Sequence, residues 1–264
     1  LRAILPAVRA AGAAERVKAA KAAKAGGGGS SATAPATSPP SFLARQTPVS
    51  AALWAAYAAY FASIFFSSAL PGEPIWRTPP EVLRAVWDES LNFFYVNPAL
   101  HALGLTLIPD SPQHPTSEAI FNFDAGYGLL LGPAWLSDWK RREVAGVSDA
   151  NTVKWWVGAL LLTNVFAFPY MALREQVAEP GERPPPPPTT LASGLDPAAL
   201  PPWAPAVGVV GGVVGAVSLA WAAAGRPDLG GDLAARAAWF ADAAGRTDRA
   251  LFAFALDACC YAAW

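Results

Sequence analysis

Long apolar segments alternate with polar ones along this chain. Residues 51–70, 119–136, 155–173 and 204–224 are almost continuously apolar, and each approaches the ~20 residues that an α-helix needs to cross about 30 Å of hydrocarbon. A fifth apolar segment, residues 250–264, is shorter. The pattern predicts an all-α integral membrane protein with four to five transmembrane helices.

Residues 80–108 have a different pattern, with apolar and polar positions mixed. Pro79 and Pro80 favour the start of a helix there. Residues 91–108 of this segment hold Pro98 and three polar side chains that would need partners in lipid, those of Asn92, Asn97 and His101. We therefore predict an interfacial amphipathic helix at about residues 80–108 rather than a further crossing.

Extended Pro/Gly-rich arms divide the chain into four parts. A basic, Gly/Ser/Pro-rich arm covers residues 1–49, and a first membrane region covers residues 50–176. A polyproline linker, residues 177–203, leads to a second membrane region at residues 204–264. Polyproline is extended and stiff, so the linker is interpreted as a spacer, with docking to a partner's aromatic groove as the alternative.

Basic residues predict the topology. The N-terminal arm carries six basic groups against one acid, Glu15, within residues 1–24, which is typical of a plastid or mitochondrial import segment or of a basic helix on an anionic membrane surface. The cluster Lys140–Arg142 predicts that its loop lies on the same, non-translocated side as the arm. The loop at 71–118 and the polyproline linker are predicted to lie on the other side.

Composition narrows the function classes. The chain is 53% hydrophobic and 15% charged, with a net charge of −1, which gives no reason to expect nucleic acid as a partner. Its two cysteines are adjacent and it has only two histidines, so no metal-ligand spacing is present. No catalytic constellation is evident, and the chain is interpreted as a non-enzyme; a membrane enzyme that acts on a lipid or quinone is the alternative.

Polar residues inside the apolar segments are the main candidates for function. Glu118, Asp124 and Arg174 are ionisable groups in or beside predicted spans, where charge is costly. Asp124 is expected to pair with Arg174, or else to carry a proton or bind an ion. Asn164 is expected to hydrogen-bond another helix, and Pro169 to kink its own.

A glycine stripe marks the predicted span at residues 204–224. Two overlapping GxxxG patterns remove side chains from part of its surface, which lets another helix or a flat cofactor approach closely. The four helix-packing residues are Gly208, Gly211, Gly212 and Gly215.

His101 and Asn164 are candidate chlorophyll ligands. Each is a neutral donor in an apolar segment, and a magnesium porphyrin needs one donor from the protein. The alternative for His101 is a hydrogen bond at the level of the lipid headgroups. Contact with chlorophyll and carotenoid is expected only if the chain belongs to a pigment-containing assembly.

Several motifs within residues 89–176 resemble an uncharacterised family of small multi-pass membrane proteins of cyanobacteria and plastids. The motifs that carry the resemblance are Asn92-Phe93-Phe94, Asn97-Pro98, His114-Pro115, Ser117-Glu118-Ala119, Phe121-Asn122-Phe123, Thr163-Asn164 and the run from Pro169 to Arg174. The resemblance implies a plastid membrane location, for which the thylakoid is favoured. The distribution of basic residues then predicts that the N-terminus lies on the stromal side. It implies no reaction.

Together these observations predict a non-catalytic accessory or scaffolding subunit of a thylakoid supercomplex. Its partners would be other membrane subunits and lipids, and its setting a photosynthetic one. The alternative is a multi-pass carrier for a small molecule or ion, centred on Asp124, Asn164 and Pro169.

Overall fold

The computed structural model describes residues 41–95, 97, 100–101, 103–105, 113–143, 145–177 and 200–261. All the regular elements within these residues are helical, which confirms the predicted all-α class. Most of the N-terminal arm and of the polyproline linker lies outside the described residues, so the predictions made for the conformation of these segments stay predictions.

Eight α-helices form most of the described part. They are α2 (Pro48–Phe66), α3 (Pro80–Glu89), α5 (Pro115–Ser137), α7 (Asp149–Leu162), α8 (Asn164–Arg174), α9 (Ala204–Ala224), α11 (Leu233–Asp242) and α12 (Arg249–Tyr261). Shorter helical turns connect them: η1 (Leu43–Arg45), η2 (Ile75–Arg77), η3 (Ser90–Phe93), α6 (Trp139–Glu143), α10 (Pro227–Gly230) and the π-helical η5 (Ala243–Thr247).

Helix starts follow the local sequence. Pro48 and Pro115 occupy the first turns of α2 and α5, where a missing N–H costs nothing. The Thr47 side chain accepts a hydrogen bond from the Ser50 N–H, and the His114 ring accepts one from the Thr116 N–H. These caps satisfy backbone donors that the first turn leaves unpaired.

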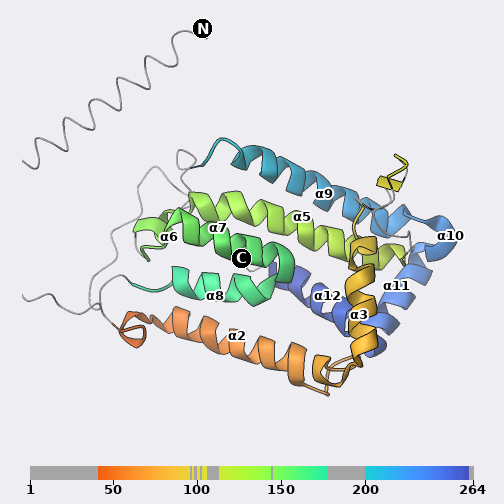
Figure 1. The fold of residues 1–264 in the computed structure, drawn as a ribbon, viewed down its shortest axis with the longest axis horizontal. Coiled ribbons are helices and arrows are strands. Elements are labelled where there is room, and N and C mark those ends of the chain that lie inside the picture. The colour runs from red at the N-terminus through yellow and green to blue at the C-terminus, as the bar shows by residue number, and fades with distance from the viewer. Residues whose placement is uncertain are drawn as a thin grey trace, which may run out of the picture. The chain divides into compact units, whose positions relative to one another are not determined.

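The long helices lie side by side around α5 (Figure 1). α5 packs against α9 on one side and against α7 and α12 on others, while α2 packs against α8. A buried cluster of mostly aromatic residues joins α5, α7, α8 and α12. In it the Trp135 and Tyr170 rings stack with centroids 3.9 Å apart.

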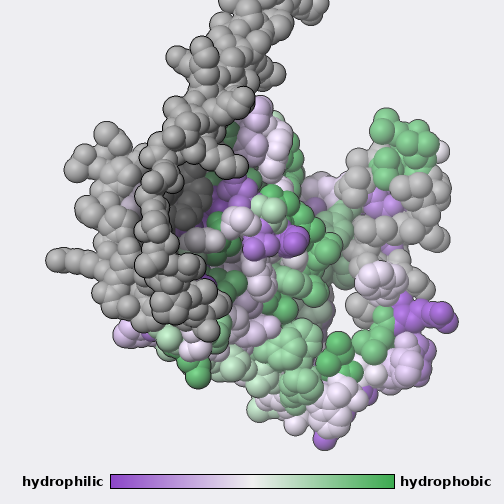
Figure 2. Space-filling view, turned by 60° about the vertical axis from the view of Figure 1, so that its left-hand side comes forward, coloured by the Kyte–Doolittle hydropathy of each residue, from purple (hydrophilic) through white to green (hydrophobic). Residues whose placement is uncertain are grey.

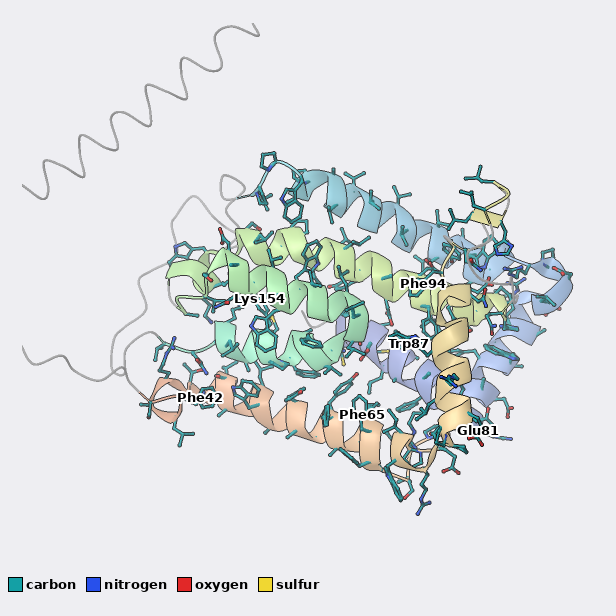
Figure 3. The ribbon with its side chains drawn as sticks, in the orientation of Figure 1. Phe42, Phe65, Glu81, Trp87, Phe94 and Lys154 are labelled. Carbon is teal, nitrogen blue, oxygen red and sulfur yellow. The ribbon has the colours of Figure 1, made fainter. Side chains whose placement is uncertain are left out.

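We call the end of the bundle where α2 begins the proximal end, and the end where α2 finishes the distal end. At the proximal end Arg45 donates to the carbonyl of Val177 over 2.9 Å, and the Trp156 and Trp203 rings stack. At the distal end the Gly72 N–H donates to the Arg246 carbonyl over 3.2 Å. Phe42 lies at the proximal end, and Glu81 and Trp87 of α3 at the distal end (Figure 3).

The predicted span at residues 155–173 is not one helix. It breaks at Thr163 into α7 and α8, which pack against each other as a helical hairpin. The two helices are close enough that a Cβ on Gly158 would lie 2.4 Å from the Phe166 ring. The expected kink at Pro169 is therefore not the main feature, because the chain already reverses six residues earlier.

The hairpin also corrects the predicted topology. Since α8 returns to the end from which α7 came, Glu175 and Val177 lie beside Thr47 and Arg45 at the proximal end. The polyproline linker thus begins at the same end as the loop that contains Lys140. The prediction that the two lie at opposite ends was wrong.

Two helices, α2 and α9, are long and apolar enough to cross a membrane, with mean hydropathies of 1.6 and 1.9. Only 11% of each apolar stretch is buried within the protein, and Val209, Val213 and Leu219 of α9 are among its exposed apolar residues. Hydrophobic residues are prominent on the face drawn in Figure 2. The finer prediction of four to five crossings is not confirmed, because among the described helices only α2 and α9 are both long and apolar enough.

Candidate functional site

A buried polar cluster lies where α12 meets the tip of the α7–α8 hairpin. The Asp257 carboxylate, on α12, accepts hydrogen bonds from Tyr60 over 2.9 Å and from the Asn164 amide over 2.8 Å. Its other oxygen accepts a hydrogen bond from the Thr163 hydroxyl. Asp257 is only 2% exposed, so these three donors replace the water that a buried carboxylate loses.

The hairpin tip is held in an unusual backbone conformation. Thr163 has φ 40° and ψ −117°, values that favour glycine and that strain a β-branched residue. Asn164 directly follows it and is fully buried at the first position of α8. The Asp257 carboxylate therefore faces the positive end of the α8 dipole, which favours a negative charge there.

Asp124 is the unusual group near this cluster. It lies in the middle of α5 and is 2% exposed. Among the described residues neither of its carboxylate oxygens has a hydrogen-bond partner. Asp124 and Asp257 are nevertheless close enough for their charges to interact.

Tyrosines line the same region. The Tyr261 ring stacks on Tyr127 with centroids 4.3 Å apart, and the Tyr127 hydroxyl donates to the Tyr261 carbonyl over 2.7 Å. Tyr261 is also within electrostatic range of Asp124 and Asp257. The site therefore combines two buried acids with polar neutral groups, an arrangement that can hold a proton or a small cation.

The structure does not form the expected pair between Asp124 and Arg174. Arg174 instead binds Asp138 and, over 2.6 Å, Glu175 at the proximal end. Burial opposes its charge, but hydrogen bonding and attraction to Asp138 outweigh that effect and raise the pKa of Arg174. Asp138 and Glu175 thus supply the negative charges that neutralise Arg174, and Arg174 does not pair with Asp124.

Glu118 has a structural role at the distal end. It is 1% exposed and pairs with the Arg226 guanidinium over 2.9 Å. The Trp221 indole N–H donates to its other oxygen over 2.7 Å. These contacts tie the start of α5 to the end of α9.

The predicted glycine stripe on α9 makes one close contact. A Cβ on Gly211 would lie 2.5 Å from the Gly126 carbonyl oxygen of α5, whereas one on Gly208 would make an ordinary contact with Pro133. A Cβ on Gly212 or Gly215 would meet nothing within 4 Å. A Cβ on Gly126 would in turn lie 2.8 Å from the Gly211 carbonyl oxygen and 2.9 Å from the Gly215 backbone N, so the helix contact is centred on Gly126 and does not use the whole stripe.

The two candidate chlorophyll ligands do not lie in one site. His101 is half-buried in a short helical turn after η3. Asn164 is fully buried, with its amide donated to Asp257. Pigment ligation by either residue stays a prediction.

The sequence interpretation missed Asp257 and Tyr60. Asp257 is the acid in the apolar segment at residues 250–264, and an acid within an apolar segment is the signal that singled out Asp124. Because the segment seemed too short to cross a membrane, its acid was overlooked.

Comparison of the chain with protein-family models, with curated proteins and with solved structures finds no match in any of the three. The resemblance of residues 89–176 to a plastid and cyanobacterial family stays a prediction.

Proposed function

We propose that this chain is a multi-pass membrane carrier for a small cation, with Asp124 as the binding group. The observation that supports the proposal best is the Asp124 carboxyl itself, which is buried and has no hydrogen-bond partner among the described residues. An isolated ionised carboxylate in an apolar interior is very costly. Such a group therefore carries a proton or a cation, and inside a membrane it commonly marks an ion pathway.

The helix arrangement supports this proposal. In our proposed topology α2, α5 and α9 cross the membrane completely, and α5, with 23 residues, is long enough to do so. The α7–α8 hairpin then enters from the proximal end and α12 from the distal end. The interrupted α7–α8 element meets α12 at Asp257, and discontinuous helices of this kind form cation sites near the midplane of many transporters.

Reconstitution into liposomes tests the carrier. Purified full-length protein is expected to dissipate imposed proton, sodium or potassium gradients faster than protein-free liposomes do. Asp124→Asn removes the charge with little change of shape and should abolish the flux. Asp242→Asn is the matched control, because Asp242 has a side chain that is 61% exposed.

Two results would contradict the carrier: no flux above protein-free liposomes for any of the three cations, or full flux in Asp124→Asn. Circular dichroism and gel filtration of both variants show whether a lost flux reflects a lost fold.

A second candidate is the accessory subunit of a larger membrane assembly, in a thylakoid setting. It is favoured by exposed apolar residues at the distal end outside α2, α5 and α9. These residues are Trp76 (55% exposed), Trp87 (80%), Leu103 (75%) and Leu105 (55%). Such a surface suits a partner subunit or the membrane interface.

Blue-native electrophoresis after mild detergent extraction separates the two candidates. A subunit is expected in a large band, whose absorption spectrum would also test contact with chlorophyll and carotenoid. Trp87→Ser should release the chain from that band. Migration of the wild type alone or as a small oligomer would contradict the subunit role.

A further inference from the structure

We infer that the cation carried by Asp124 is a proton. This inference rests on the proposed carrier function and names its cargo. It follows from the hydrogen-bond donors around Asp124 and Asp257 and from the repulsion between the two carboxylates when both are ionised.

The donor set suits a proton better than a metal cation. Hard metal cations take six or more oxygen ligands, whereas a proton needs one. Within the described residues no group of three His, Cys, Asp or Glu side chains could hold a metal ion. Both Asp257 oxygens are already occupied by donors from Tyr60, Thr163 and Asn164.

The two acids differ in a way that assigns the proton to Asp124. Asp257 accepts three hydrogen bonds and faces the start of α8, both of which favour its charged form. Among the residues that the structure describes, Asp124 has no such donor. Two interacting carboxylates in an apolar interior do not readily ionise together, and the donors around Asp257 assign the charge to it and the proton to Asp124.

The charged and titratable groups that act on Asp124 strengthen this assignment. On α12 they are Asp257 and Tyr261, neither of which is a cation. On α5 itself Tyr127 lies next to Tyr261, and on α2 Tyr60 reaches Asp257. Neutral phenols do not supply the positive charge that an ionised Asp124 would need.

Loss of the proton would act on the hairpin tip. An ionised Asp124 repels Asp257, which holds Thr163 and Asn164 in the strained turn between α7 and α8. Proton release thus weakens the contact between α12 and the hairpin. This links the charge state of Asp124 to a movement of the α7–α8 hairpin against α12.

Carbodiimide labelling tests the inference on the purified full chain. Dicyclohexylcarbodiimide partitions into apolar regions and reacts with a protonated carboxyl. The acid O–H adds across one C=N bond, and the adduct rearranges to a stable acylurea without oxidation or reduction. At about pH 8 exposed carboxyls are ionised, so peptide mass spectrometry should find the label on Asp124 and not on Asp242.

Each result of the labelling has a defined meaning. The inference predicts label on Asp124 in the wild type and in Asp242→Asn, no labelled peptide in Asp124→Asn, and no protection by sodium or potassium salts. Protection by either salt together with a salt-driven flux would overturn the proton while leaving the carrier intact. Label at Asp124 without any flux would support the protonated acid and contradict the carrier.

A second measurement covers the case in which the reagent cannot reach Asp124. The infrared carbonyl band of a protonated carboxylic acid should be present in the wild type at about pH 8, where exposed carboxyls do not contribute to it. It should disappear in Asp124→Asn and persist in Asp242→Asn. An unchanged spectrum in Asp124→Asn would overturn the inference.

Discussion

Gly126 of α5 and Gly211 of α9 lie against each other, so that a Cβ on Gly211 would come within 2.5 Å of the Gly126 carbonyl oxygen. A backbone atom cannot move aside as the end of a side chain can. Gly211→Ala should therefore push α9 away from α5 and lower the free energy of unfolding by about 1–3 kcal/mol. The midpoint of thermal unfolding in detergent measures the effect.

Gly212 supplies the matched control one residue along the same helix. A Cβ there would meet nothing within 4 Å, so Gly212→Ala should leave stability unchanged or raise it slightly through its better helix propensity. Equal losses in Gly211→Ala and Gly212→Ala would show that α9 does not pack on α5 through Gly211.

The turn at Thr163 gives a second prediction, because its conformation suits glycine while its hydroxyl binds Asp257. Thr163→Ala and Thr163→Gly both lose the hydroxyl, but only glycine also relieves the strain. Thr163→Gly should therefore be more stable than Thr163→Ala by about 1–3 kcal/mol. If alanine proved the more stable variant, a continuous helix through residue 163 would be the better description.

Hydropathy predicted the long helices well and the hairpin not at all. The expected span at 204–224 matches α9, and those at 51–70 and 119–136 overlap α2 and α5 closely. Residues 155–173 are apolar on both sides of the reversal, and the turn itself has neither glycine nor proline. The reversal depends on the contact with Asp257, from a helix more than ninety residues away, and no local pattern carries that information.

The candidate site, too, could be predicted from the sequence only in part. Asp124 could be selected from the sequence because an acid inside an apolar segment is expensive wherever the chain goes. Its partners could not be selected, since Arg174 finds Asp138 and Glu175 at the proximal end instead. Which acid pairs with Arg174 depends on where α8 ends, and the α7–α8 hairpin places that end beside Asp138 at the proximal end.

His114 should make stability depend on pH. Its ring stacks on Trp239, and its Nδ1 accepts the Thr116 N–H at the start of α5, which requires that this nitrogen carry no proton. Burial, and then the nearby Arg236 charge, lower the pKa of His114 below its usual 6.5. Its contribution to stability is therefore complete above pH 6.5 and is lost as the pH falls from there through the lowered folded-state value.

His114→Asn isolates this effect, because asparagine also caps a helix but does not titrate in this range. The thermal midpoint of the wild type should fall more than that of His114→Asn between pH 7.5 and about pH 5. Parallel pH profiles for the two proteins would show that other groups control the acid sensitivity.

Arg249 joins the start of α12 to the end of α2. Its guanidinium donates to backbone carbonyls at 2.7–3.1 Å, those of Ile64, Ser67, Leu70, Pro71 and Gly72. A lysine ammonium cannot reach so many acceptors from one position. Arg249→Lys should lower stability by about 1–3 kcal/mol, whereas Arg246→Lys, at a side chain that is 78% exposed, should change little. Equal effects would mean that Arg249 does not hold this junction.

The α7–α8 hairpin makes a prediction about sidedness that a single crossing at residues 155–173 does not. Ser148, before α7, and Pro202, before α9, are both exposed at the proximal end. Glu81 and Asp232 are exposed in elements of the distal end, α3 and the start of α11. Single cysteines at 148 and 202 should therefore react with a membrane-impermeant maleimide from one side, and those at 81 and 232 from the other.

The experiment needs a background in which Cys259 and Cys260, on α12, are replaced by serine. A crossing at residues 155–173 followed by a linker on the far side would instead place 148 and 202 on opposite sides. Labelling of those two positions from opposite sides would rule out the hairpin within a membrane, and with it the meeting of two broken helices at Asp257. Labelling from the same side requires that the chain turn back between them, and Thr163 is where the structure turns it.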